Sequence, residues 1–303
     1  MATATETLDP TPDLNTSGTP SRSIATRIAG RLGQGTVQVI LIVIAVFWLV
    51  PVFGLLISSL RPDTANSSSG WWTALTAPSQ LTLENYANLL GESTITSSLI
   101  NTVLISVPAT VLVVLIGALA AYALAWIDFP GRDWVMIGVV GLLVVPIQIA
   151  LIPIAKFYGA TGLFGTITGV VLFHVAFGLP FAVFLLRNYF SGIPRDLLEA
   201  ARMDGGTEWS IFRRVVLPIG LPAIASLSIF QFLWVWNDLL VALVFADPDS
   251  QPITIALRGQ LRQFGSNIDI LASGSFISII IPLIVFFSFQ RYFVQGVLAG
   301  STK

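Results

Sequence analysis

Six long intervals of the chain contain no Asp, Glu, Lys or Arg and are rich in apolar residues. They are residues 32–60, 93–127, 134–155, 157–186, 215–237 and 270–290. A helix needs ~20 mostly apolar residues to cross the hydrocarbon core of a bilayer, and each interval can supply them. The apolar runs are continuous rather than alternating, which favours helices over barrel strands. The sequence therefore predicts an all-α integral membrane protein with six transmembrane helices.

The composition agrees with this fold class and excludes several functions. The chain is 54% hydrophobic and 10% charged, whereas a soluble domain carries roughly 25% charged residues. A net charge of −1 gives no reason to expect nucleic-acid binding. The absence of cysteine excludes disulfides, thiolate zinc sites and a Cys nucleophile. We expect neither a catalytic residue nor a metal site.

The distribution of Lys and Arg predicts the orientation in the membrane. With the N-terminus inside, most of the 15 basic residues fall on the inner side, and the outer segments hold only Arg61, Lys156, Arg258 and Arg262. Because basic residues favour the cytoplasmic side, both termini and the polar insert at 190–213 are predicted to be cytoplasmic.

The chain divides into a tail and a membrane domain. Residues 1–35 are rich in Ser, Thr, Pro and Gly and are predicted to be a disordered cytoplasmic tail, followed by a transmembrane domain over 36–303. The expected helices cover about 37–60, 97–126, 134–155, 164–189, 216–245 and 273–294, with outer loops at 61–95 and 246–272.

The 190–213 insert, called the coupling insert below, has the signals of a short helix, a turn and a second short helix. Pro194 suits the first turn of a helix, and Gly205 with Gly206 can end it in a left-handed turn. Thr207 can cap the second helix. The small side chains of Ala200 and Ala201 would let a partner surface approach the backbone closely. An amphipathic helix resting on lipid headgroups remains the alternative.

Several motifs in this region resemble those of ABC importer permeases. Glu199-Ala200-Ala201, then Asp204-Gly205 and then Leu217-Pro218 resemble the coupling motif of that family, with Gly206 standing where the family often has Ala. Phe184-Leu185-Leu186-Arg187 and the end of the chain, Gln290 to Gly296 followed by Ala299-Gly300, resemble the carbohydrate-uptake, maltose-type branch. The resemblance covers about 37–303 and is closest to the smaller of the two permeases.

The resemblance implies a function and a set of partners. The chain would be the permease subunit of an ATP-driven importer in the inner (plasma) membrane of a prokaryote. It would pair with a second homologous permease, two ATPase subunits and an extracytoplasmic solute-binding protein. The ATPase-coupling contacts would be Glu199, Ala200, Ala201, Asp204, Gly205, Leu217 and Pro218.

The sequence also bears on where ATP binds. Neither Lys156 nor Lys303 lies in a phosphate-binding loop, so the chain is predicted to need no cofactor of its own, with ATP and Mg²⁺ held by the ATPase subunits. Alternatives remain open: a permease for another small solute, such as glycerol phosphate or an amino acid, or an ion-coupled secondary carrier. Such a carrier needs membrane-embedded ionisable groups, for which only Asp238 qualifies, with His174 distant in sequence.

A polar stretch near the outer end of the fifth span is the candidate substrate pathway. Tryptophan faces stack on sugar rings and side-chain amides bond hydroxyl groups. The residues concerned are Gln231, Trp234, Asn237 and Asp238, with Gln148 beside Pro146 as a further candidate. A sugar, either a disaccharide, an oligosaccharide or a related polyol, is the expected solute. An interfacial cap for Asp238 and helix–helix hydrogen bonding for Gln148 are the alternative interpretations.

Overall fold

The structure is a computed structural model that describes residues 24–260 and 268–301, with side chains for 35–260 and 268–290. The chain divides into two units, residues 1–53 and 54–303, which are described separately. The N-terminal unit consists, in its described part, of helix α1 (Ile24–Ser59), whose last turns belong to the second unit. Of the predicted tail, the structure describes residues 24–35 as part of α1. Residues 1–23 of that tail lie outside the described residues.

The regular secondary structure in the described part of the second unit is helical, apart from one isolated bridge between Gly165 and Ala246, and turns and loops connect the helices. Its long helices are α4 (Ser93–Trp126), α7 (Ile167–Phe190), α10 (Leu217–Trp236) and α13 (Ile268–Ser301). The shorter ones are α2 (Asp63–Ser68), α3 (Glu84–Gly91), α5 (Arg132–Leu143), α6 (Ile147–Thr161), α8 (Arg195–Met203), α9 (Glu208–Ile211), α11 (Leu240–Phe245) and α12 (Ile253–Gly259).

Among the described residues, five helices are long and apolar enough to cross a membrane, and a sixth span exists if the bent pair α5–α6 is one. The predicted all-α membrane fold is therefore confirmed. The prediction of one helix over 134–155 is wrong, since this region forms two helices, α5 and α6, that meet at 100°. Pro146 lacks a backbone N–H and disfavours a helical residue before it, which accounts for the break.

The fifth helix is also shorter than predicted. It was expected to run to residue 245, but α10 ends at Trp236 and α11 begins at Leu240. The carboxylate of Asp238 accepts hydrogen bonds from the backbone N–H groups of Val241 and Ala242, at 3.3 and 3.0 Å. An acidic side chain that binds free N–H groups starts a new helix rather than continuing the old one.

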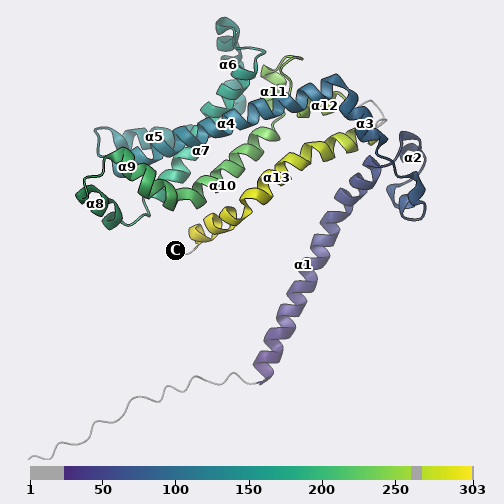
Figure 1. The fold of residues 1–303 in the computed structure, drawn as a ribbon, viewed down its shortest axis with the longest axis horizontal. Coiled ribbons are helices and arrows are strands. Elements are labelled where there is room, and N and C mark those ends of the chain that lie inside the picture. The colour runs from purple at the N-terminus through teal and green to yellow at the C-terminus, as the bar shows by residue number, and fades with distance from the viewer. Residues whose placement is uncertain (1–23, 261–267, 302–303) are drawn as a thin grey trace, which may run out of the picture. The chain divides into compact units, whose positions relative to one another are not determined.

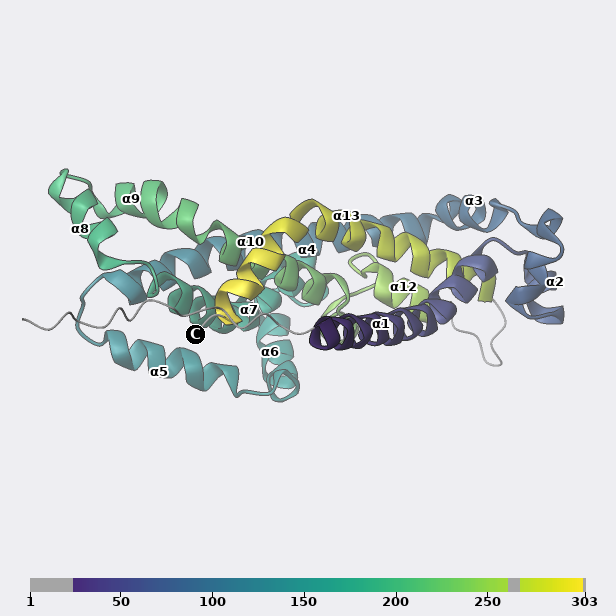
Figure 2. The ribbon, with the colours of Figure 1, turned by 90° about the horizontal axis from the view of Figure 1, so that it is seen from below.

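Helices α4, α7 and α10 form the core of the second unit. Figures 1 and 2 show α4 running alongside α7, with α10 packed against both and α13 against α10. The close approach of α4 to α7 depends on Gly117, where an added Cβ would lie 2.9 Å from the Cβ of Ala182. Small residues at helix contacts are the usual way to pack helices closely in lipid, where apolar burial adds little.

The segment predicted as an outer loop at 61–95 is folded around Arg61, whose side chain is completely buried. Its guanidinium donates to the Gln80 side chain at 2.8 Å, to the carbonyls of Ala65 and Ser69, and to nearby hydroxyl groups. A buried charge is tolerated only when it is fully hydrogen-bonded, so this arginine organises the segment. Charge patterning placed Arg61 on the outer side but gave no signal that it is buried.

Candidate functional site

The coupling insert lies at one end of the helical unit. Figure 1 shows α8 and α9 at one end of the long helices and α3 and α12 at the opposite end. The insert follows α7 and leads into α10, so it is covalently continuous with two of the three core helices. A displacement of the insert therefore acts directly on the core of the unit.

Helix α8 presents one face to the protein and the other to its surroundings. Leu198 is completely buried and Ala201 is half-buried, whereas Glu199 and Ala200 are exposed. Leu197, the residue before Leu198, is exposed as well. The exposed face therefore carries an acid, a small residue and an apolar side chain in a fixed helical frame.

A glycine turn ends α8 as predicted. Gly205 has φ +79°, and an added Cβ there would meet no atom within 4 Å. The φ value, and not crowding, is what favours glycine. At Gly206 the reason differs, since a Cβ would lie 2.7 Å from the carbonyl oxygen of Ala201. Thr207 caps α9 as predicted, because its hydroxyl accepts from the backbone N–H of Ser210 at 3.3 Å.

The predicted Leu217-Pro218 element begins α10, directly after a π-helical turn over 212–216. The N–H of Leu217 bonds to the carbonyl of Phe212, which is the wider π spacing. Pro218 has no backbone N–H, so it cannot donate the α-helical hydrogen bond to the carbonyl four residues earlier. Pro218 is exposed and Leu217 half-buried.

A network of four side chains tethers the insert to α4. None of the four was among the predicted site residues. The Tyr122 hydroxyl donates to the Glu208 carboxylate at 2.5 Å, and Arg202 forms an ion pair with Glu208 at 3.0 Å. Arg202 also donates to the carbonyl of Trp126 at 3.4 Å, and the Trp126 indole N–H donates to the carbonyl of Phe190 at 3.1 Å. The ends of α4 and α7 and both helices of the insert are thereby joined in one network.

The tether is partly open to solvent. The side chains of Arg202 and Glu208 are 40% and 44% exposed, and the hydrogen bond that Arg202 donates to the Glu208 carboxylate raises the pKa of Arg202 above its ordinary value. The Tyr122 ring also packs against Phe212, with centroids 5.2 Å apart. Sequence reasoning missed Tyr122, because a single tyrosine inside an apolar run gives no sign of its partner 86 positions away.

The predicted pathway residues are only partly brought together. Gln231 and Trp234 line a cavity of about 320 Å³ between α7 and α10, and the other lining residues are Phe177, Gly178, Phe181 and Phe230. Gln231 is buried, and its Nε2 has no hydrogen-bond partner within the described part of the chain. Trp234 meets the ring of His174 edge-on at 5.3 Å.

The other three candidates have different surroundings. Asp238 caps α11, and one of its oxygens lies 3.7 Å from Nε2 of the buried His174. Asn237 is exposed and donates to the carbonyl of Leu233 on its own helix. Gln148 is exposed near the start of α6 and does not line the cavity between α7 and α10. A pathway role for these three stays a prediction.

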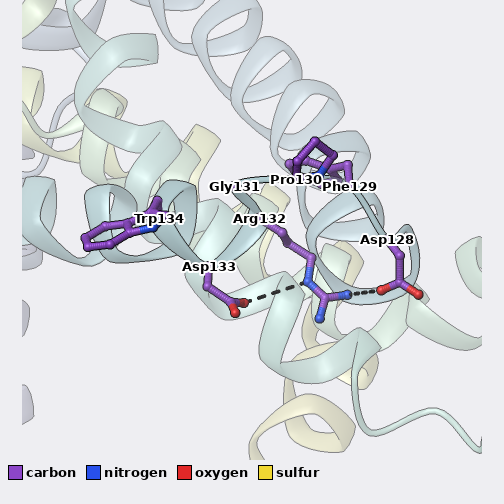
Figure 3. A pocket seen from close by; sticks show the side chains of 7 residues that line it. All are labelled: Asp128, Phe129, Pro130, Gly131, Arg132, Asp133 and Trp134. Carbon is purple, nitrogen blue, oxygen red and sulfur yellow. Dashed lines mark hydrogen bonds and ion pairs between the residues drawn. The ribbon is translucent and has the colours of Figure 1, made fainter.

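A second hollow, of about 580 Å³, lies against the turn between α4 and α5. Figure 3 shows that all its side chains come from the 128–134 turn and that Arg132 lies between two carboxylates. Arg132 pairs with Asp128 at 2.8 Å and approaches Asp133 at 3.8 Å. The charge of Arg132 is thus balanced by two neighbouring acids, whose side chains are almost fully exposed. We therefore assign the residues around this hollow a role in forming the turn and not in binding.

These features describe a membrane protein in which an exposed helix at one end is hydrogen-bonded to a helical core that carries an open hollow. The family described as the binding-protein-dependent transport system inner membrane component matches residues 97–299. The chain belongs to this family. It is accordingly a membrane permease subunit and not an enzyme.

Relatives and solved structures agree with that assignment. The chain is 48% identical to the osmoprotective compounds uptake permease GgtD of Synechocystis sp., over 88% of this chain and 91% of the relative. It is 48% identical to the alpha-glucoside transport system permease AglG of Rhizobium meliloti, over 82% of this chain and 67% of the relative. The trehalose transport system permease SugB of Mycobacterium tuberculosis is 36% identical, over 84% and 92% respectively.

The fold itself recurs in a solved structure. A chain of a bacterial ABC transporter involved in alginate import matches with a TM-score of 0.72 at 22% identity, and the match covers 91% of this chain and 100% of that chain. At this level of identity the likeness concerns the fold alone.

Proposed function

We propose that this chain is one permease subunit of an ATP-driven importer that moves a sugar, with an α-glucoside or a related disaccharide as the preferred class. Family membership supports the importer, and similarity to the alpha-glucoside permease AglG and the trehalose permease SugB supports the solute class. GgtD, named for osmoprotective compounds, keeps a small polyol-like solute within the proposal.

The observation that carries the coupling mechanism is the exposed face of α8. Glu199 and Ala200 face outward on a helix whose opposite side is anchored by the fully buried Leu198. Such a helix can dock in a groove of an ATPase subunit without refolding, and Asp204 and Gly205 extend the contact along the turn. Leu217 and Pro218 lie at the junction with α10, where a docking movement would enter the membrane.

The remaining partners follow from the same proposal. A second homologous permease would complete the pathway, and two ATPase subunits would bind ATP and Mg²⁺ on the cytoplasmic side. A solute-binding protein would deliver the sugar on the outer side, and a bacterial alginate ABC transporter has been solved in complex with a periplasmic protein that holds an alginate pentasaccharide. In the membrane, nucleotide-driven closure would switch the helical core between two arrangements.

Reconstitution tests the proposal. The chain is placed in liposomes with its sister permease, ATPases and binding protein, and uptake of labelled trehalose, maltose and sucrose is measured with ATP hydrolysis. Ala200→Trp adds bulk to the exposed face of α8 and should abolish sugar-stimulated hydrolysis. Trp134→Leu, at an exposed position near the start of α5, serves as a control that should change nothing.

Three results would contradict it. Import of an amino acid or glycerol phosphate in place of any sugar would refute the solute class. Uptake driven by an ion gradient without the ATPases would refute the importer class and favour the secondary carrier. Sugar-stimulated hydrolysis that survives Ala200→Trp would show that α8 is not the docking helix.

A further inference from the structure

We propose that the 3₁₀ helix η1 (Trp71–Leu75) is a lipid-binding surface that enters the headgroup region of the membrane and anchors the adjoining end of α1 there. It follows α2, which lies with α3 at the end of the unit opposite the coupling insert (Figures 1 and 2). Because that insert is predicted to be cytoplasmic, the headgroups concerned are those of the outer leaflet. This surface is independent of the solute that the protein carries.

The helix η1 packs against the membrane-spanning part of α1. The span of α1 ends at Ser59, and Gly54 lies about 7.5 Å further in along the helix axis at 1.5 Å per residue. A Cβ added at Gly54 would lie 2.7 Å from the indole nitrogen of Trp71, so the Trp71 ring fills the space beside this glycine. The headgroup region on each side of a bilayer is roughly 5–8 Å thick. The contact therefore holds η1 at the depth of the headgroups.

The spacing of η1 gives it one face toward the protein and one face away from it. A 3₁₀ helix has three residues per turn, so residues i and i+3 share a face. Ala74 shares the face of Trp71 and is 3% exposed, which marks this face as the packed one. Trp72 and Leu75 share another face, and each is 61% exposed. A large aromatic ring and a leucine thus project together from the protein.

The buried Arg61 fixes the direction of this exposed face. Its guanidinium donates to the hydroxyl of Thr73 at 3.1 Å and to the hydroxyl of Ser69 at 2.7 Å. Thr73 lies between the two projecting residues in the sequence and is held toward the arginine. Trp72 and Leu75 therefore cannot turn inward without breaking hydrogen bonds to a buried charge, which is costly. The exposed pair is a fixed feature of the folded segment.

The chemistry around η1 favours lipid over a protein partner. Residues 64–83 contain no Asp, Glu, Lys or Arg, so no charge in this stretch opposes contact with acyl chains. Tryptophan is enriched at the membrane–water boundary, where its ring is apolar and its N–H stays hydrated. Contacts between membrane subunits prefer small residues, which a projecting Trp–Leu pair does not offer. A soluble binding protein approaches from the water and not from beside the last turns of α1.

Fluorescence quenching at single cysteines tests contact with lipid directly. The chain has no cysteine, so an introduced cysteine carries the only bimane label on this subunit once the cysteines of its partners are replaced. Leu75→Cys reports the proposed surface, and Ser68→Cys, exposed on α2, is the control that should face water. Phe47→Cys, in the middle of the α1 span, is the reference for a label within the acyl chains. The assembled transporter is measured in lipid nanodiscs.

The two quenchers should rank the labels in opposite orders. Brominated phospholipids should quench Leu75→Cys about threefold more than Ser68→Cys, and iodide should quench it about threefold less, because the membrane interface excludes the anion. Phospholipids brominated near the headgroup end of the acyl chain should quench Leu75→Cys more than those brominated near the chain terminus. The reverse preference is expected for Phe47→Cys.

A second set of variants tests whether the two projecting side chains hold the segment in the membrane. Thr76→Cys, exposed directly after η1, carries the label. Replacing both Trp72 and Leu75 by serine should lower its quenching by brominated lipid about twofold or more, because the apolar anchor is lost. Trp134→Ser, which removes an exposed tryptophan from α5, should leave that quenching unchanged.

Three outcomes would overturn the inference. Equal quenching of Leu75→Cys and Ser68→Cys by lipid, with iodide reaching both, would show that the surface faces water. A label at Leu75→Cys that neither quencher reaches would show that the sister permease or the binding protein covers it. Unchanged quenching of Thr76→Cys after the double serine replacement would show that the pair does not anchor the segment. None of these results bears on the solute, so the proposed function is tested separately.

Discussion

If α8 docks on an ATPase subunit as proposed, removing the Tyr122 hydroxyl should weaken that binding, although Tyr122 lies outside the proposed docking surface. Tyr122→Phe deletes the 2.5 Å hydrogen bond to Glu208 and keeps the ring contact with Phe212. Hydrogen bonds to charged groups contribute roughly 1.5–3 kcal/mol, and the lower end applies because the Glu208 side chain is 44% exposed. The Arg202–Glu208 ion pair is similarly exposed and contributes ~1 kcal/mol at most to holding the insert in place.

The expected change in affinity follows from the fraction of molecules in which the insert has the orientation that binds the ATPase. When a binding-competent orientation becomes rarer, the apparent Kd rises by the same factor. A loss of about 1.4 kcal/mol corresponds to a tenfold increase in Kd. We therefore expect about a tenfold weaker affinity of the ATPase for the permease pair, measured by biolayer interferometry with the pair in lipid nanodiscs.

A matched tyrosine and a double-mutant cycle make this prediction specific. Tyr189→Phe removes a hydroxyl that only approaches the carbonyl of Ile219 at 3.4 Å, and it should leave the Kd within twofold of wild type. In a Glu208→Gln background the effect of Tyr122→Phe should shrink to threefold or less, since the two residues share one interaction. Equal Kd values for Tyr122→Phe and Tyr189→Phe would refute the idea that the tether positions the insert.

Three further substitutions test the packing of the second unit. Gly117→Leu should lower the thermal stability of the purified protein by about 1–3 kcal/mol through overpacking, whereas Gly138→Leu, which has open space around it, should not. Arg61→Met removes the buried hydrogen-bonding centre of the 61–91 segment, so limited proteolysis should cut there at least tenfold faster, and unchanged cleavage would count against that role. Asp238→Ala should cost about 1 kcal/mol by uncapping α11, with Asp249→Ala on the exposed loop as a control in the same thermal assay.

The sequence was sufficient for the class of fold and for the local shape of the coupling insert. Charge-free apolar runs mark membrane spans directly, because the bilayer penalises every exposed charge. The left-handed Gly205 and the Thr207 cap are local backbone properties, so they can be predicted from neighbouring residues alone. The same holds for the exposed Glu199 on the insert.

Features that depend on distant contacts could not be predicted in this way. The tether between Tyr122 and Glu208 joins two regions that have no common local pattern. The break after Trp236 depends on whether the Asp238 carboxylate turns back to the N–H groups of α11, and a polar residue near a helix end allows either outcome. For the pathway, residue chemistry pointed to Gln231, but only the packing of α7 against α10 shows that this residue lines a cavity.

The bend between α5 and α6 has a consequence for how the protein is made. Helix α5 has 12 residues and α6 has 15, or roughly 18 and 22 Å of helix, and neither reaches across a ~30 Å hydrocarbon core. Helix α5 packs against α7, which the ribosome produces later. The break at Pro146 is local, but the packing of α5 against α7 can form only after α7 has been made. Entry into the bilayer and acquisition of the final packing are separate events in biogenesis, and substitutions at Pro146 should alter the second without preventing the first.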